Sequence, residues 1–150
     1  MLRARRGGRP APAAPPGAEA VLSRVHAKDW IAGYERAWRA AGTDALEHLF
    51  TRDATYLMAP FEAAIVGLDA IARMWEVERD GPDERFAMGS EIVALDGDVV
   101  VARVAVRYEG PAPIEYRDLW IMRFAADGRC RHFEEWPFWP GQPLARGRRS

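Results

Sequence analysis

The fold of this chain is decided by residues 84–139, which read ERFAMGSEIVALDGDVVVARVAVRYEGPAPIEYRDLWIMRFAADGRCRHFEEWPFW. The stretch holds four runs rich in Val, Ile, Tyr, Phe and Trp. Tight-turn signals separate them, such as Asp96-Gly97-Asp98 and Ala126-Asp127-Gly128. It therefore predicts four antiparallel strands joined by short hairpins: Phe86 to Leu95, Val99 to Glu109, Ile114 to Ala125 and Cys130 to Trp139.

The residues before this stretch predict helices that cover one face of the sheet, because their apolar side chains recur at helical spacing. The expected elements are, in order, a helix from Asp29 to Ala41, a short helix capped by Asp44 with Glu47 as in a capping box, a brief strand at residues 53–58, and a helix from Leu68 to Arg79. Helices on one face of a strongly bent antiparallel sheet make an α+β cone, and the open end of such a cone can hold a ligand.

Composition and charge argue for one domain that does not bind nucleic acid. The chain has 150 residues, of which 49% are hydrophobic, enough for one sizeable core. Seven arginines lie in the two tails, and without them the chain has 14 basic and 22 acidic residues. The part of the chain between the two tails is therefore acidic, with a net charge near −8. Phosphate contacts need clustered Lys and Arg, so we expect no nucleic-acid partner.

The tails, the single cysteine and the histidines set further expectations. Prolines interrupt residues 10–16, so we expect a disordered leader at residues 1–24, dispensable to about residue 20, a domain at 25–140 and a basic tail at 141–150. One cysteine, Cys130, and no run long enough to span a membrane indicate a cytoplasmic protein without a membrane partner. His26, His48 and His132 lack ligand-like spacing, so no metal or other cofactor is expected.

Several short stretches, in this order and at this spacing, carry a family resemblance: residues 30–38, 53–56, 67–71, 117–124, 127–129 and 133–136. Over residues 28–140 the chain resembles the nuclear transport factor 2-like superfamily, particularly its SnoaL-like branch. The resemblance implies an α+β cone that encloses a pocket. It identifies the activity poorly, because the same scaffold hosts isomerases, cyclases, dehydratases, epoxide hydrolases and non-catalytic binders.

Two enzyme templates of the superfamily fit only in part. The tyrosine of ketosteroid isomerases corresponds to Tyr34, but their two acid positions fall on Met58 and Trp120. The water-activating network of limonene-epoxide hydrolases is matched by a tyrosine, an arginine and a carboxylate, here Tyr56, Arg103 and Glu135. Its asparagine and second carboxylate are replaced by Met58 and Ala105.

The resemblance implies a pocket in which polar groups converge inside an apolar wall. The expected catalytic residues are Tyr34, Tyr56, Arg103, Asp118 and Glu135, and the expected substrate-binding residues are Trp30, Trp38, Met58, Trp75, Trp120, Met122 and Phe133. Only the resemblance favours Arg103 inside, because Arg103 shares strand parity with Arg107 and both would otherwise lie on the solvated outer face.

The contact between Arg103 and Glu135 decides the chemistry that we expect. We favour the pair, since an unpaired buried carboxylate is costly, and a paired Glu135 stays ionised at neutral pH as a base or an anchor. If Arg103 points outward, Glu135 is protonated near neutrality and serves as a general acid.

Three functions remain open at this point. The first is a cofactor-independent cyclase, isomerase, dehydratase or hydrolase acting on a small apolar substrate. The second is a non-catalytic binding module for an apolar metabolite, and the third is a dimerisation module with a filled cone. A homodimer through the outer face of the sheet is expected because Leu119 and Ile121 alternate with inward residues and leave apolar side chains outside.

Overall fold

The computed structural model of this chain describes residues 16–79 and 83–142, with side chains from residue 24 onwards. Six strands form one sheet in the order β2-β1-β6-β5-β4-β3. Four of them form the predicted antiparallel meander: β3 (Phe86–Asp96), β4 (Val99–Tyr108), β5 (Ile114–Phe124) and β6 (Cys130–Phe138). The predicted strands are confirmed, with ends that differ by at most one residue.

The first strands make the sheet mixed rather than purely antiparallel. β1 (Phe50–Leu57) begins earlier than predicted and runs parallel to β6, with Tyr56 opposite Phe133. β2 (Ile65–Val66) pairs antiparallel with β1. The sequence did not predict β2, since a strand of two residues is too short to show alternation.

The helices occur in the predicted order, but their bounds differ from the prediction, most of all at the start of α1. α1 (Pro16–Arg39) begins before Val25, so the expected domain boundary at residue 24 falls inside the helix, and residues 1–15 lie outside the described part. α2 (Leu46–Leu49) has Ala45 at its N-cap without a side-chain cap, so the capping box of Asp44 and Glu47 was wrong. Backbone carbonyls satisfy its first turn instead: the Leu46 amide donates to the Thr43 carbonyl.

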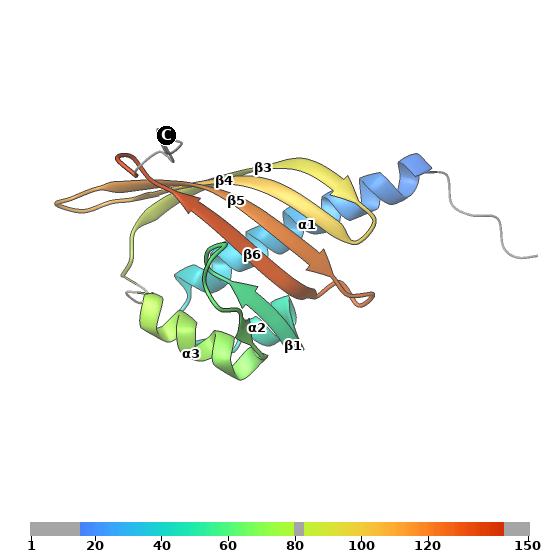
Figure 1. The fold of residues 1–150 in the computed structure, drawn as a ribbon, viewed down its shortest axis with the longest axis horizontal. Coiled ribbons are helices and arrows are strands. Elements are labelled where there is room, and N and C mark those ends of the chain that lie inside the picture. Colours follow the sequence, from blue (N-terminus) through green and yellow to red (C-terminus); the bar gives the residue numbers. More distant parts are fainter. Residues whose placement is uncertain (1–15, 80–82, 143–150) are drawn as a thin grey trace, which may run out of the picture.

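Helices lie along the inner side of the curved sheet (Figure 1). α1 runs beneath β3 to β6, whereas α2 and α3 (Leu68–Glu78) lie beside β1. Arg79, buried just after α3, donates to the carbonyls of Ala37 and Gly42 and so joins the ends of two helices. None of the helices in the described ranges is long and apolar enough to cross a membrane.

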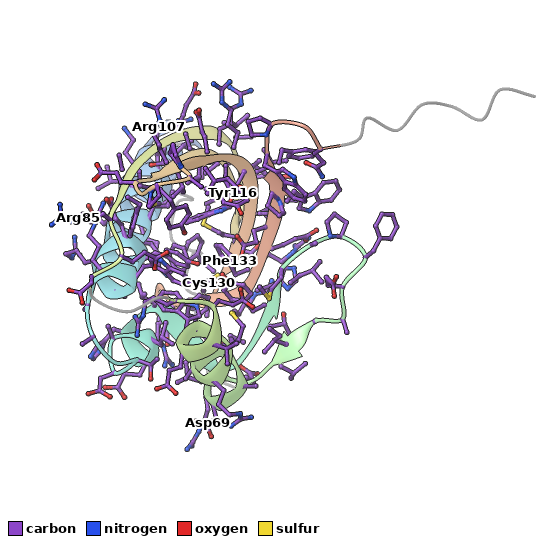
Figure 2. The ribbon with its side chains drawn as sticks, turned by 90° about the vertical axis from the view of Figure 1, so that its left-hand side faces the viewer. Asp69, Arg85, Arg107, Tyr116, Cys130 and Phe133 are labelled. Carbon is purple, nitrogen blue, oxygen red and sulfur yellow. The ribbon has the colours of Figure 1, made fainter. Side chains whose placement is uncertain are left out.

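The core fills the closed end of the curved sheet, where aromatic rings from helices and strands meet. Its largest fully buried side chains include Trp75, Tyr56, Phe50 and Phe133. Viewed from the side, the sheet arches over the interior and the helices close the opposite side, so that Tyr116 and Phe133 lie inside the arch (Figure 2). Irregular pairing in β3 and near the β5–β6 turn contributes to this curvature.

Candidate active site

A cavity of about 1200 Å³ opens where the core ends. Its wall is formed by α1, α3, the end of β1 and the inner faces of β3 to β6. Along each strand every second residue lines the cavity, because successive side chains of a strand point to opposite faces of the sheet. The cone is therefore not filled, contrary to what a pure dimerisation module with a filled cone requires.

The central polar feature of the cavity wall is a chain of three hydrogen-bonded side chains. The Tyr34 and Tyr56 hydroxyls are 2.8 Å apart, and the Tyr56 hydroxyl donates to Oε1 of Glu135 over 2.9 Å. Tyr56 and Glu135 meet because β1 and β6 are neighbours and Glu135 lies two residues beyond Phe133, on the same face. Tyr34 reaches them from α1, which lies across the sheet. All three side chains line the cavity.

A second carboxyl group, that of Asp118, lies in the wall on the neighbouring strand β5. Asp118 is opposite Pro137 in the β5–β6 pair, so it is a diagonal neighbour of Glu135 on the inner face. The residue is only 7% exposed. Its Oδ2 accepts a long hydrogen bond, 3.4 Å, from the Trp120 indole, and its Oδ1 has no hydrogen-bond partner among the described residues.

Burial raises the pKa of both carboxyl groups, and the charge of Asp118 raises that of Glu135 further. Burial first, and the charge of Asp118 second, raise the pKa of Glu135 from 4.5 to about 8, although the Tyr56 hydrogen bond lowers it in part. Burial raises the pKa of Asp118 from 3.8 to about 6. Near neutral pH the pair therefore holds about one proton, mainly on Glu135, while Asp118 is mainly ionised.

Tyr34 and Tyr56 remain hydrogen-bond donors at and well above neutral pH. Burial, followed by the charge of Glu135, raises the pKa of Tyr34 and of Tyr56 well above the ordinary value of 10.0. The phenols therefore stay protonated, and Tyr56 can stabilise the ionised form of Glu135 by donating to it.

Arg103 does not lie in this site, so the expected pair of Arg103 and Glu135 was wrong. The Arg103 side chain is 67% exposed and lies 3.3 Å from Glu91 on the outer face of the sheet. Arg103 and Arg107 are an even number of residues apart on β4, so both side chains lie on the same, outer face of the sheet. Arg103 thus points outward, and no basic side chain contacts Glu135 among the described residues.

The predicted wall residues divide between the cavity and the core. Trp38, Met58 and Trp120 line the cavity. The other four pack in the core and do not line it: Trp30, Trp75, Met122 and Phe133. The Trp30 indole, for example, donates to the carbonyl of Leu49 over 2.8 Å, which ties α1 to α2.

Sequence reasoning missed several residues of the cavity wall, among them Tyr108, Tyr116, Phe86 and Met88. Strand parity contained the signal for two of them. Tyr116 has the parity of Asp118 and Trp120, and Tyr108 has the parity opposite to Arg103. The ends of β3 to β6 near Phe86, Tyr108, Tyr116 and Pro137 therefore line the cavity, and the opposite ends of these strands contribute to the core.

No group of three or more His, Cys, Asp or Glu side chains that could hold a metal ion occurs in residues 24–79 and 83–142. His132 lies on the outer face, where its Nδ1 is 2.6 Å from the Thr55 hydroxyl and its Nε2 is 3.3 Å from Glu134. Burial raises the pKa of the Cys130 thiol to about 12, which makes it a poor nucleophile.

The fold is a cone-shaped α+β arrangement with a cavity at one end. A family model described as a SnoaL-like domain matches residues 31–133, about two thirds of the chain. The chain belongs to the SnoaL-like domain family, and its fold is the nuclear transport factor 2-like cone that the resemblance implied. No curated protein is significantly similar to the sequence.

Solved structures of low sequence identity share this fold. A protein from Shewanella denitrificans described as a SnoaL-like polyketide cyclase has a TM-score of 0.63 at 15% identity, over 78% of this chain and 90% of that one. One of the same description from Jannaschia has a TM-score of 0.56 at 20% identity, over 87% and 91%. SalBIII, an epoxide hydrolase/cyclase-like enzyme with a role in pyran ring formation in salinomycin, has a TM-score of 0.61 at 16% identity, over 76% and 90%.

Proposed function

We propose that this protein is a cofactor-independent enzyme that binds a small, mainly apolar molecule in the cone and catalyses proton transfer, with Glu135 as the general acid. The proposed reaction is of the isomerase, lyase or hydrolase type. One observation carries the proposal: Glu135 lies in the wall of an open cavity without a basic partner, hydrogen-bonded to Tyr56, with its pKa raised to about 8. A catalytic acid is most effective when its pKa lies near the working pH.

The proposed roles follow from the contacts of each group. Glu135 gives its proton to an oxygen or carbon atom of the substrate, and the carboxylate that forms is stabilised by the hydroxyl of Tyr56, 2.9 Å away. Tyr34 holds Tyr56 in place. Asp118 favours the protonated form of Glu135 before the reaction. The Glu135 carboxylate then takes a proton from another substrate atom or from water, which restores the acid.

A non-catalytic binding module is the second candidate, and the apolar wall favours it. The two positions that hold acids in ketosteroid isomerases are Met58 and Trp120 here, and both line the cavity. The hydroxyls of Tyr34 and Tyr56 are occupied within the hydrogen-bonded chain, so they are not free to polarise a substrate carbonyl. In this alternative Glu135 serves only to hold a ligand.

Replacing Glu135 with glutamine tests the proposal, because the change is nearly isosteric and removes the transferable proton. Small carbonyl, epoxide and hydroxy-ketone compounds would first be screened for turnover and for binding. With a compound that is turned over, we expect Glu135→Gln to lower kcat by about 10²-fold or more while binding is largely kept. The control is Glu134→Gln, on the same strand but directed at Trp136 and His132.

The outcomes separate the two candidates. Undiminished turnover by Glu135→Gln contradicts a role for Glu135 as the acid. If compounds bind but none is turned over by the wild-type protein, the binding module is the better account.

We propose further that two copies of this chain associate through the outer face of the sheet. Leu119, Ile121 and Trp136 lie there half-buried, and Phe138 at the end of β6 is 53% exposed. Light scattering at micromolar concentration should give the mass of a dimer, and Leu119→Lys should give that of a monomer. A monomer mass for the wild-type protein contradicts this assembly.

A further inference from the structure

Acidic residues dominate the polar part of the cavity wall. The acidic residues in the wall are Glu78, Asp83, Glu84, Glu109, Asp118 and Glu135, and Arg85 is the one basic residue among those that line it. Arg85 lies at the edge of the molecule in Figure 2, well away from Tyr116 and Phe133 inside the arch. The charge that a ligand meets inside the cavity is therefore negative.

An acidic wall alone does not make a site, but Asp118 adds an independent observation. Its side chain lines the cavity while the residue is 93% buried, and Oδ1 has no hydrogen-bond partner among the described residues. An ionised carboxylate can accept about four hydrogen bonds, whereas this one accepts a single long bond of 3.4 Å from Trp120. No Lys, Arg or His of the described residues forms an ion pair with it.

A buried carboxylate in this state favours any ligand group that supplies both donors and positive charge. A protonated amine supplies up to three N–H donors and one charge, which matches the unfilled acceptor positions of Asp118. A hydroxyl group supplies one donor and no charge. An anionic group would place a second negative charge beside the ionised Asp118, and is disfavoured.

Aromatic side chains near Asp118 add to this preference. Trp120 donates to Asp118 and packs against Tyr34, with ring centroids 4.7 Å apart. Tyr108 and Tyr116 line the outer part of the cavity, with ring centroids 6.0 Å apart. The faces of such rings attract cations, and the same rings bind the apolar body of a ligand.

We propose that the cavity selects a ligand with a protonated amine on an apolar body, and that Asp118 is the anion that receives the amine. The proposal rests on the proposed function in placing the ligand in the same cavity as Glu135. It assigns the two carboxyl groups different tasks: Asp118 anchors the substrate through its nitrogen, and Glu135 exchanges the proton.

Three probes of one shape test the ligand class in isothermal titration calorimetry at neutral pH and low salt. They are phenethylammonium, 2-phenylethanol and phenylacetate, which present a cation, a neutral hydroxyl and an anion on the same phenyl body. We expect the cation to bind about tenfold more tightly than the alcohol, and the anion to bind more weakly than either. Equal binding of cation and alcohol, or no binding of the cation at millimolar concentration, overturns the proposal.

Two variants then test the anchor. Asp118→Asn should weaken phenethylammonium by about tenfold and leave 2-phenylethanol within about twofold. Asp69→Asn, an exposed aspartate at the start of α3, is the matched control and should change neither. If Asp118→Asn weakens cation and alcohol equally, the residue shapes the cavity and does not select charge. The wild-type comparison of the three probes decides the ligand class even if Asp118→Asn folds poorly.

These results are independent of turnover. If the cation preference holds and Glu135→Gln keeps full turnover, the ligand class stands and the proposed catalytic role fails. If the cation preference is absent and Glu135→Gln loses turnover, the catalytic role stands and the ligand class fails.

Discussion

Replacing Glu135 with glutamine should remove a pH dependence of stability that the cavity imposes on the fold. Burial and the charge of Asp118 raise the pKa of Glu135 from 4.5 to about 8. Between these two values the folded protein keeps a proton that the unfolded chain releases, so the free energy of unfolding falls as pH rises. The stabilisation is fully present below pH 4.5 and is lost by pH 8.

The size of the effect follows from the two pKa values. Each pKa unit corresponds to about 1.4 kcal/mol, so the full difference sets an upper bound of about 5 kcal/mol. The Glu135 side chain is partly open to the cavity, and water there screens the charge, so we expect a change on the order of 2 kcal/mol. Asp118, with its pKa raised to about 6, adds a smaller change of the same sign at lower pH.

Urea unfolding between pH 5 and pH 8.5 measures the effect. The wild-type protein should lose stability across this range, whereas Glu135→Gln should lose much less and exceed the wild type at pH 8. Glu134→Gln should follow the wild-type curve. All other ionisable side chains are the same in the wild type and in Glu135→Gln, so the difference between these two curves isolates Glu135. Parallel curves for wild type and Glu135→Gln would refute the reasoning.

Three other substitutions have defined outcomes. Tyr56→Phe removes the hydrogen bond that favours ionised Glu135, so the carboxyl pKa should rise further, by about one unit, in a carbon-13 NMR titration; an unchanged or lower pKa contradicts this. Gly128→Ala should destabilise the fold by about 1–3 kcal/mol in urea unfolding, because φ is +87° and a Cβ would lie 2.9 Å from the His26 ring. Arg103→Ala should change stability by less than about 1 kcal/mol and leave turnover intact, and lost turnover would mean that Arg103 acts on the site.

Much of the fold could be predicted because independent signals agreed along residues 84–139. Alternating apolar residues, β-branched composition and glycine-containing turns all indicated the same four strands, and all four are present. Where one signal stood alone, the prediction failed. The capping pattern at Asp44 suggested a side-chain cap, but α2 is a single turn whose amides bond to preceding carbonyls.

For the candidate site, strand parity correctly predicted which side chains point to the inner face of the sheet. Glu135 and Asp118 have inward parity, and both line the cavity. For Arg103 the resemblance predicts the inner face of the sheet, whereas strand parity predicts the outer face. Parity is the stronger argument, because moving one residue to the other face would turn every neighbour on β4 as well, including the buried Val104.

The protonation state of Glu135 could not be predicted from the sequence, since it depends on which face of the sheet carries the positive charges. The arginines of β4 and β5 lie on the exposed outer side: Arg103, Arg107, Arg117 and Arg123. Glu91 and Glu115 pair with three of them there. On the inner face no cation contacts Asp118 or Glu135 among the described residues, so no positive charge offsets the desolvation that raises their pKa.

This separation of charge across one sheet links the fold to the proposed chemistry. Had an arginine of β4 faced inward, Glu135 would be an ion-paired base, and the cavity would have no unbalanced negative charge to offer a ligand. With the arginines outside, one proton is shared by two carboxyl groups of unequal pKa, which supplies an acid in Glu135 and an anion in Asp118 at the same pH. The proposed acid and the proposed anchor thus both follow from the same strand register.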